Sequence, residues 1–180
     1  MKKVTFAFLF MALLFGVSDV FGQNQLLSNS EKFVEEPGRI LEKEMVTMGV
    51  LNVKYNLQKQ TMNINTLVMK DLMTDKVRSC LILELIKKTK YAYIDPDEIA
   101  GLTNMLKLMQ KKFINSVRIN YTELVYSTRG GTEAGCFFDE DKWIVFLRLD
   151  KSEKNTIIEI KSEDLQKFID LLNEVDKMVN

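Results

Sequence analysis

Apolar and polar residues alternate along one early stretch of the chain, and the alternation changes phase once. Residues 46–50 alternate in one phase, and residues 51–55 continue in the other. A period of two is typical of a β-strand with one buried face, so we expect a strand over residues 45–57. The change of phase predicts a bulge or a strong twist near Gly49.

Four shorter apolar segments in the second half also predict strands. Turn-forming stretches separate them, namely Arg129-Gly130-Gly131, Asp139-Glu140-Asp141 and the polar residues 150–155. Glycine closes the first turn because it adopts positive φ angles without steric cost. The expected strands cover residues 119–127, 132–138, 143–149 and 156–160.

A period of about 3.6 residues predicts two amphipathic helices. One follows Asp95-Pro96-Asp97-Glu98, where Asp95 caps, Pro96 fits the first helical position and the acidic residues face the helix dipole. The other follows Ser162. Residues 23–38 predict a loose lead-in, in which Ser30 would cap a short helix.

The chain resembles itself at a shift of 66 residues. Residues 54–114 fall on 120–180 without a gap, and the apolar positions of the two expected helices coincide. We therefore expect an α+β fold of two tandem ββββα units, each an antiparallel sheet with one C-terminal helix, packed about a pseudo-twofold axis. The predicted divisions are a lead-in over 23–44, a first unit over 45–114 and a second over 115–180. One continuous sheet and two separate sheets both fit this pattern.

Residues 1–22 have the layout of a cleavable signal peptide. Lys2 and Lys3 precede an apolar run over residues 4–17, and Gly22 is a small residue at the cleavage position. Since a bilayer span needs roughly 20 apolar residues, cleavage is favoured over a membrane anchor. We expect an exported protein, periplasmic or extracellular, with no transmembrane segment after cleavage.

Composition and charge describe an ordinary globular chain, with 46% hydrophobic and 28% charged residues. Without residues 1–22 the chain keeps 23 basic and 24 acidic side chains, so no strong field draws nucleic acid. Export permits a disulfide between Cys80 and Cys136, and two buried free thiols are the alternative. Their separation cannot be read from the sequence.

The chain contains no histidine, which removes the commonest general base and the histidine-based nucleophile and metal sites. It also lacks a phosphate-binding loop, a dinucleotide fingerprint and paired-cysteine metal motifs. We expect no catalytic residues, no metal and no cofactor. The sequence favours a non-enzymatic protein that binds a protein, a peptide or a cell-surface component.

The candidate binding residues are Arg129, Trp143, Asp139 and Asp141. Arg129 with its glycines would cradle an anion, although a plain hairpin turn is favoured. The acidic stretch 139–141 would hold calcium or serve a carboxylate-dependent hydrolase, although a solvated turn is favoured. Trp143 would anchor a partner, but its repeat equivalent Val77 favours packing in the core. The carboxylates of Asp95-Pro96-Asp97-Glu98 are likewise better explained by helix capping than by catalysis.

Several short motifs carry a resemblance over residues 90–180. They are Thr128-Arg129-Gly130-Gly131, Ala134-Gly135, Lys142-Trp143, Leu149-Asp150 and Asp164-Leu165, together with the signal ending Phe21-Gly22-Gln23. In these the chain resembles small exported proteins of unknown function from Bacteroidetes-type bacteria, a resemblance that implies no activity. The four-strand-plus-helix unit is also similar to the whirly and PC4 class of single-stranded DNA binders. Those proteins need a basic, aromatic-studded sheet face, so single-strand binding is the least favoured function.

Overall fold

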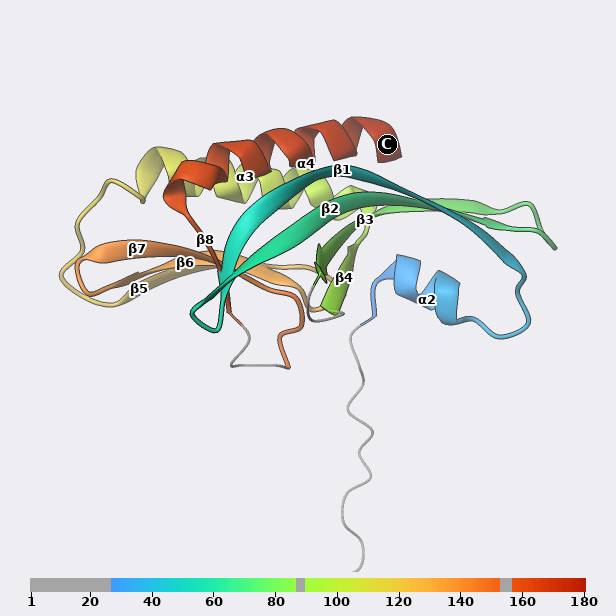
Figure 1. Ribbon diagram of the computed structural model, residues 1–180, viewed down its shortest axis with the longest axis horizontal. Helices are drawn as coiled ribbons and strands as arrows, with labels where there is room; N and C mark the ends of the chain where they lie inside the picture. Colours follow the sequence, from blue (N-terminus) through green and yellow to red (C-terminus); the bar gives the residue numbers. More distant parts are fainter. Residues whose placement is uncertain (1–26, 87–89, 153–156) are drawn as a thin grey trace, which may run out of the picture.

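The computed structural model describes residues 27–86, 90–152 and 157–180 (Figure 1). The predicted signal peptide, residues 1–22, lies outside the described residues. The elements in chain order are α2 (Asn29–Glu35), β1 (Leu41–Tyr55), β2 (Gln58–Asp71), β3 (Val77–Leu85), β4 (Lys90–Ile94), α3 (Pro96–Lys112), β5 (Thr122–Ser127), β6 (Glu133–Asp139), β7 (Lys142–Arg148), β8 (Ile158–Ile160), a 3₁₀ turn (Ser162–Asp164) and α4 (Leu165–Val179). None of the helices described is long and apolar enough to cross a membrane.

Within the described residues the strands form one eight-stranded sheet in the order β4-β3-β2-β1-β8-β7-β6-β5. Every neighbouring pair is antiparallel. The prediction of an α+β fold with antiparallel strands is confirmed. Of the two arrangements left open, the structure has a single sheet, which holds more strands than either predicted unit.

The 66-residue shift agrees with only part of this architecture. It carries β3, β4 and α3 onto β7, β8 and α4, but it places the β5–β6 turn on the middle of β2. The cause is a difference in length, because β1 and β2 have 15 and 14 residues whereas β5 and β6 have six and seven. The gapless repeat is therefore not confirmed along its whole length.

The bulge expected near Gly49 is confirmed, because the pairing of β1 with β2 shifts register between Thr47 and Gly49. Gly49 also faces α4, where a Cβ atom would lie 2.6 Å from the Leu171 side chain. The strand is longer than predicted at its start and begins at Leu41, within the expected lead-in. It ends at a two-residue turn in which Asn56 and Leu57 adopt positive φ.

Helices α3 and α4 lie side by side on one face of the sheet (Figure 1). They run antiparallel, since Asn180 after the end of α4 donates to the carbonyl of Pro96 at the start of α3. Both helices bury their apolar stripes in one core with residues from every strand. Burial of this apolar surface is the main source of stability, at about 25 cal/mol per Å² removed from water.

Helix α2 covers a second, smaller apolar cluster on the opposite face of the sheet. Its members are Phe33, Leu67, Met69, Cys80 and Ile82. The predicted cap for this helix was wrong, because Ser28 rather than Ser30 caps it. The Ser28 hydroxyl accepts from the Glu31 N–H at 3.0 Å, and the Glu31 carboxylate accepts from the Ser28 N–H at 2.7 Å. This reciprocal pair is a capping box.

Candidate functional site

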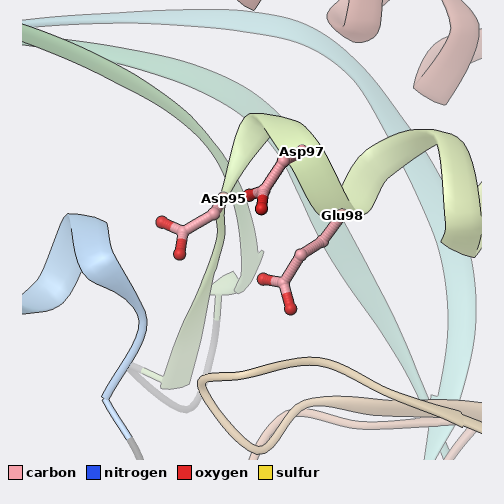
Figure 2. A group of neighbouring side chains, drawn as sticks. All are labelled: Asp95, Asp97 and Glu98. Atoms are coloured by element: carbon pink, nitrogen blue, oxygen red, sulfur yellow. The ribbon is translucent and has the colours of Figure 1, made fainter.

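Three carboxylates gather where β4 passes into α3. One oxygen each of Asp95, Asp97 and Glu98 lies within 4.8 Å of the others (Figure 2). The gathering follows from the local sequence, since Pro96 starts the helix and the acidic residues fill its first turn. Asp95 and Glu98 are buried and Asp97 is exposed. This acidic cluster is the densest group of potential metal ligands among the described residues.

Arg129 from the β5–β6 turn supplies the countercharge to this cluster. Its guanidinium donates to Asp95 Oδ2 at 2.6 Å and to Asp97 Oδ2 at 2.7 Å. Its backbone N–H donates to Glu98 Oε1 at 2.6 Å. The hydrogen bond to Asp97 is the largest of the effects that raise the pKa of Arg129 above its usual value. The predicted hairpin turn is present, but its arginine binds the protein's own carboxylates.

Asp95 holds the N-terminus of α2. Its carboxylate accepts from the Asn29 N–H at 2.8 Å, from the Ser30 N–H at 2.9 Å and from the Ser30 hydroxyl at 2.7 Å. Only 1% of Asp95 is exposed. Burial would by itself raise the pKa of Asp95, but the bonds from Ser30, Asn29 and Arg129 outweigh it and hold the pKa below its usual value.

This arrangement corrects the role expected for Asp95. The sequence predicted that its side chain would cap α3, yet that side chain makes no hydrogen bond to α3. It caps a helix 65 residues earlier in the chain instead. No local signal in the sequence marks such a contact, because any buried helix N-terminus can be satisfied by a distant acceptor.

The chemistry open to the cluster is restricted by its own contacts. Four donors already occupy the two oxygens of Asp95, and a divalent cation would have to displace the guanidinium of Arg129. A general acid needs a raised pKa, whereas that of Asp95 is lowered. The buried Glu98 Oε2 has no hydrogen-bond partner within the described residues. The geometry therefore favours an ion-pair network that ties α2, α3 and the β5–β6 turn together.

Within the acidic stretch, Asp139 ends β6 and Glu140 and Asp141 form the β6–β7 turn, and all three residues are exposed. Glu140 and Asp141 adopt positive φ, as a tight two-residue turn requires. Successive hairpins leave a strand at opposite ends, so these residues lie at the other end of β6 from Arg129. The predicted candidates Arg129, Asp139 and Asp141 are thus not brought together.

Trp143 lies in the core rather than on the surface, with 7% of its area exposed. Its indole N–H donates to the carbonyl of Ser116 at 2.7 Å. Its ring packs edge-on against Phe113 and Phe138, at centroid distances of 5.6 and 5.4 Å. Core packing, which the repeat favoured, therefore describes Trp143 better than a binding anchor.

Cys80 and Cys136 are both buried and free. Cys80 belongs to the cluster beneath α2, and Cys136 belongs to the main core on the other face of the sheet. The disulfide that export would permit is therefore not formed, and the alternative of two buried thiols describes the structure. Burial raises the pKa of Cys80 to about 12 and that of Cys136 to about 11, which keeps both thiols unreactive.

The sequence analysis did not identify the outer end of the β1–β3 sheet as a candidate site. We call this end, residues 41–47, 66–71 and 77–79, the arm. It projects beyond the C-terminal end of α4 (Figure 1). Its exposed apolar side chains are Met45 (57%), Val46 (42%), Val68 (38%) and Val77 (62%). An open hollow on the arm is lined by Glu42, Lys43, Glu44, Val68, Lys70 and Val77.

The apolar side chains of the arm lie on both faces of the sheet. Val46 pairs with Thr66, which pairs in turn with Leu81 of the main core, so Val46 is on the helix face. Met45 pairs with Leu67 of the cluster beneath α2, so it is on the opposite face. The charged run at residues 42–44, between apolar neighbours, is the one sequence signal that such a strand end is solvated.

Comparison of the chain with protein-family models finds no match, and comparison with curated proteins finds none either. The function is therefore inferred from the contacts and exposure of the described residues.

Proposed function

We propose that the protein is an exported, non-enzymatic binding protein that contacts a protein, a peptide or a cell-surface component through the arm. The observation that supports this proposal is the exposure of apolar side chains on both faces of the arm. Exposed apolar groups that gather in one place, rimmed by charge, are typical of interaction sites. Here Glu42, Glu44 and Lys70 supply the charged rim.

Export supports an extracellular or periplasmic partner in this proposal. The basic and apolar segments of residues 1–22 have the layout of a signal peptide, which would deliver the folded chain outside the cytoplasm. The acidic cluster supports a structural role for its carboxylates, because Arg129 and the N-terminus of α2 already occupy them.

We also propose that the fold arose as two tandem ββββα units related by a pseudo-twofold axis. The element order repeats four strands and a helix, and the helices cross over between the halves. Helix α3 packs on β5 and β6 in addition to β3, while α4 packs on β1, β2 and β3. The packing of each helix on strands of the other half, together with the antiparallel pairing of α3 and α4, supports the pseudo-twofold relation between the units. Lengthening of the first hairpin would then have produced the arm.

Two sets of apolar-to-serine substitutions test the arm as the contact surface. The triple variant Met45→Ser, Val46→Ser, Val77→Ser removes the three most exposed of the four apolar side chains of the arm and leaves Val68 in place. The control, Val117→Ser with Ile119→Ser, alters two residues that are 81% and 100% exposed on the α3–β5 loop. Because both sets are solvent-exposed, circular dichroism and thermal unfolding should stay close to the unmodified protein.

The readout is binding of the tagged protein to the envelope fraction of the cells that produce it. The arm variant should weaken binding by about tenfold or more, and the loop variant should bind like the unmodified protein. Unchanged binding of the arm variant, or an equal loss in the loop variant, would contradict the assignment of the surface.

A further inference from the structure

Strand β1 has one free edge over most of its length. Residues 53–55 pair with β8 on that side, whereas residues 41–52 pair with β2 alone among the described parts of the chain. The cause is the shortness of β8, which ends at Ile160 because the chain turns into the 3₁₀ turn at Ser162. The free edge therefore lies within the sheet, between its two halves.

The outer half of this edge is open to solvent. Residues 42–47 are all exposed. A strand without a neighbour presents a row of backbone N–H donors and C=O acceptors, which another extended chain can satisfy. Only an extended backbone offers donors and acceptors that alternate at the matching spacing.

We propose that the edge of β1 over Leu41–Val46 binds an extended peptide segment of another protein as an added antiparallel strand. This proposal rests on the proposed function of the arm and specifies its partner. The segment would place basic residues opposite Glu42 and Glu44 and an apolar residue opposite Val46. Antiparallel addition is expected because antiparallel pairing is somewhat more stable per residue than parallel pairing.

The charges of the edge define the partner. Glu42, Glu44 and Val46 share one face of β1, because they pair with Lys70, Val68 and Thr66 of β2. Lys70 forms its salt bridge with Asp75 at 2.9 Å. Within the described residues neither Glu42 nor Glu44 lies at salt-bridge distance from a basic group, although the charge of Lys70 interacts with that of Glu42 across the strand pair. Basic side chains of an added strand would therefore meet two carboxylates that lack an ion-pair partner.

The same charges disfavour a second copy of this chain. Residues opposite each other in an antiparallel pair have their side chains on the same face of the sheet. A twofold-symmetric pair of β1 strands must therefore be centred on a residue and not between two residues. Registers centred on Glu42 or on Glu44 place that glutamate against its own counterpart. The register centred on Lys43 opposes the two lysines and also opposes Glu42 to Glu44. Like charges that lie directly opposite each other destabilise a strand pair. Registers centred further along β1 are interrupted by the bulge at residues 47–49.

Synthetic peptides of matched composition test this pairing. The probe Thr-Val-Val-Lys-Thr-Lys-Thr places its lysines opposite Glu44 and Glu42, and a second peptide carries glutamate in place of both lysines. The lysine peptide should bind about tenfold or more tightly than the glutamate peptide. Amide hydrogen exchange should slow in residues 41–46 on binding. Absence of any effect on these amides would overturn the proposal.

Backbone methylation distinguishes strand addition from contact through side chains alone. In an added strand, alternate amides point toward β1 and away from it. Two versions of the lysine peptide, N-methylated on one or the other alternate set, should therefore differ. One should lose binding by about tenfold or more and the other should keep it. Any other outcome with these two peptides overturns the proposal.

Charge reversal on the protein provides the converse test. The variant Glu42→Lys with Glu44→Lys should prefer the glutamate peptide, and the neutral control Glu42→Gln with Glu44→Gln should discriminate little between the two. A preference for the lysine peptide that persists in the charge-reversed variant would overturn the proposal. A dimer of the unmodified protein that forms through β1, detected by sedimentation analysis, would overturn it as well.

The experiments can overturn the proposed function of the arm and the proposed strand addition independently of each other. If the arm triple variant loses envelope binding but no peptide binds β1, the arm is a contact surface and strand addition is wrong. If the peptides bind at β1 but the triple variant keeps envelope binding, the edge accepts a strand and the proposed function of the arm is wrong.

Discussion

Asp95 is the residue on which the packing of α2 most depends. Its buried carboxylate joins the N-terminus of α2 to Arg129, and both partners carry positive charge or partial positive charge. A buried carboxylate is stable only when it is paired and hydrogen-bonded, and here all of its partners come from other elements. Substitutions at this residue should therefore affect distant parts of the chain.

Replacement of Asp95 by asparagine should destabilise the fold by about 3 kcal/mol at neutral pH, because Arg129 and the N-terminus of α2 lose their buried charged partner. The pKa of Asp95 is lowered in the fold. Its stabilising effect is thus present above its unfolded pKa, near 3.9, and is lost as the pH falls through the folded value. In urea unfolding, the free energy of unfolding should fall less between pH 7 and pH 3 in the variant than in the unmodified protein.

The matched control for this prediction is Asp139→Asn in the exposed β6–β7 turn, which should change stability by about 0.5 kcal/mol or less. Burial and, to a smaller extent, the charge of Asp95 raise the pKa of Glu31, so Asp95→Asn changes the pH profile partly through Glu31, whereas Asp139→Asn leaves this contact intact. Parallel pH profiles for the unmodified protein and Asp95→Asn would contradict the role of this carboxylate.

Arg129 and Asp95 should act as one unit. Arg129→Met keeps the apolar stem but removes the countercharge, so it should lower the melting temperature. Because the two residues are in direct contact at 2.6 Å, the double variant Asp95→Asn, Arg129→Met should lose less stability than the two single variants together. A thermal-unfolding double-mutant cycle measures this coupling. Additive losses would show that the ion pair contributes nothing of its own.

At the scale of the element, α2 acts as a cover for the smaller apolar cluster. Phe33 and Cys80 belong to this one cluster, and Arg39 lies over the Phe33 ring at 4.3 Å from its centroid. The helix has seven residues, which is too short to be stable by itself. Its position is therefore set by Phe33 on one side and by the carboxylate of Asp95 at its N-terminus.

Loss of the Phe33 ring should expose Cys80. Phe33→Ala should cost about 3 kcal/mol and allow α2 to detach from the sheet. Labelling with a thiol reagent at pH 8, followed by peptide mass analysis, should then modify Cys80 faster, while Cys136 in the main core stays protected. Equal acceleration at both cysteines would indicate global unfolding and contradict a local role for α2. Val117→Ala, far from the cluster along the chain and exposed, serves as the control.

At the scale of the whole molecule, one core joins the two halves. The main cluster contains residues from both sets of strands and from both long helices. Each helix packs partly on strands of the other half, so neither half buries its apolar surface alone. The free cysteines on opposite faces add no covalent link between the halves.

The protein should consequently unfold in one cooperative step, and reductant should not change its melting temperature. Urea unfolding followed by tryptophan fluorescence reports the second half through Trp143, and far-ultraviolet circular dichroism reports both halves. The two transitions should coincide. Separate transitions would indicate independent domains, and a lower melting temperature in reductant would indicate a disulfide.

Sequence periodicity alone was enough to predict the elements whose signals are local. The alternation with its change of phase predicted β1 and the bulge at residues 47–49, and the acidic first turns with their apolar stripes predicted α3 and α4. The hairpin turn at Arg129-Gly130-Gly131 was also correct. These features depend on backbone geometry and on which side of an element is buried, and both repeat over a few residues.

The tertiary structure decided what depends on residues far apart in the chain. It placed β1 beside β8, put Cys80 and Cys136 on opposite faces of the sheet, and directed the Asp95 carboxylate to α2 rather than to α3. It also left the edge of β1 free, because β8 is only three residues long. Periodicity specifies which face of an element is buried but not which neighbour buries it, so strand order, capping between elements and the free edge follow only from packing.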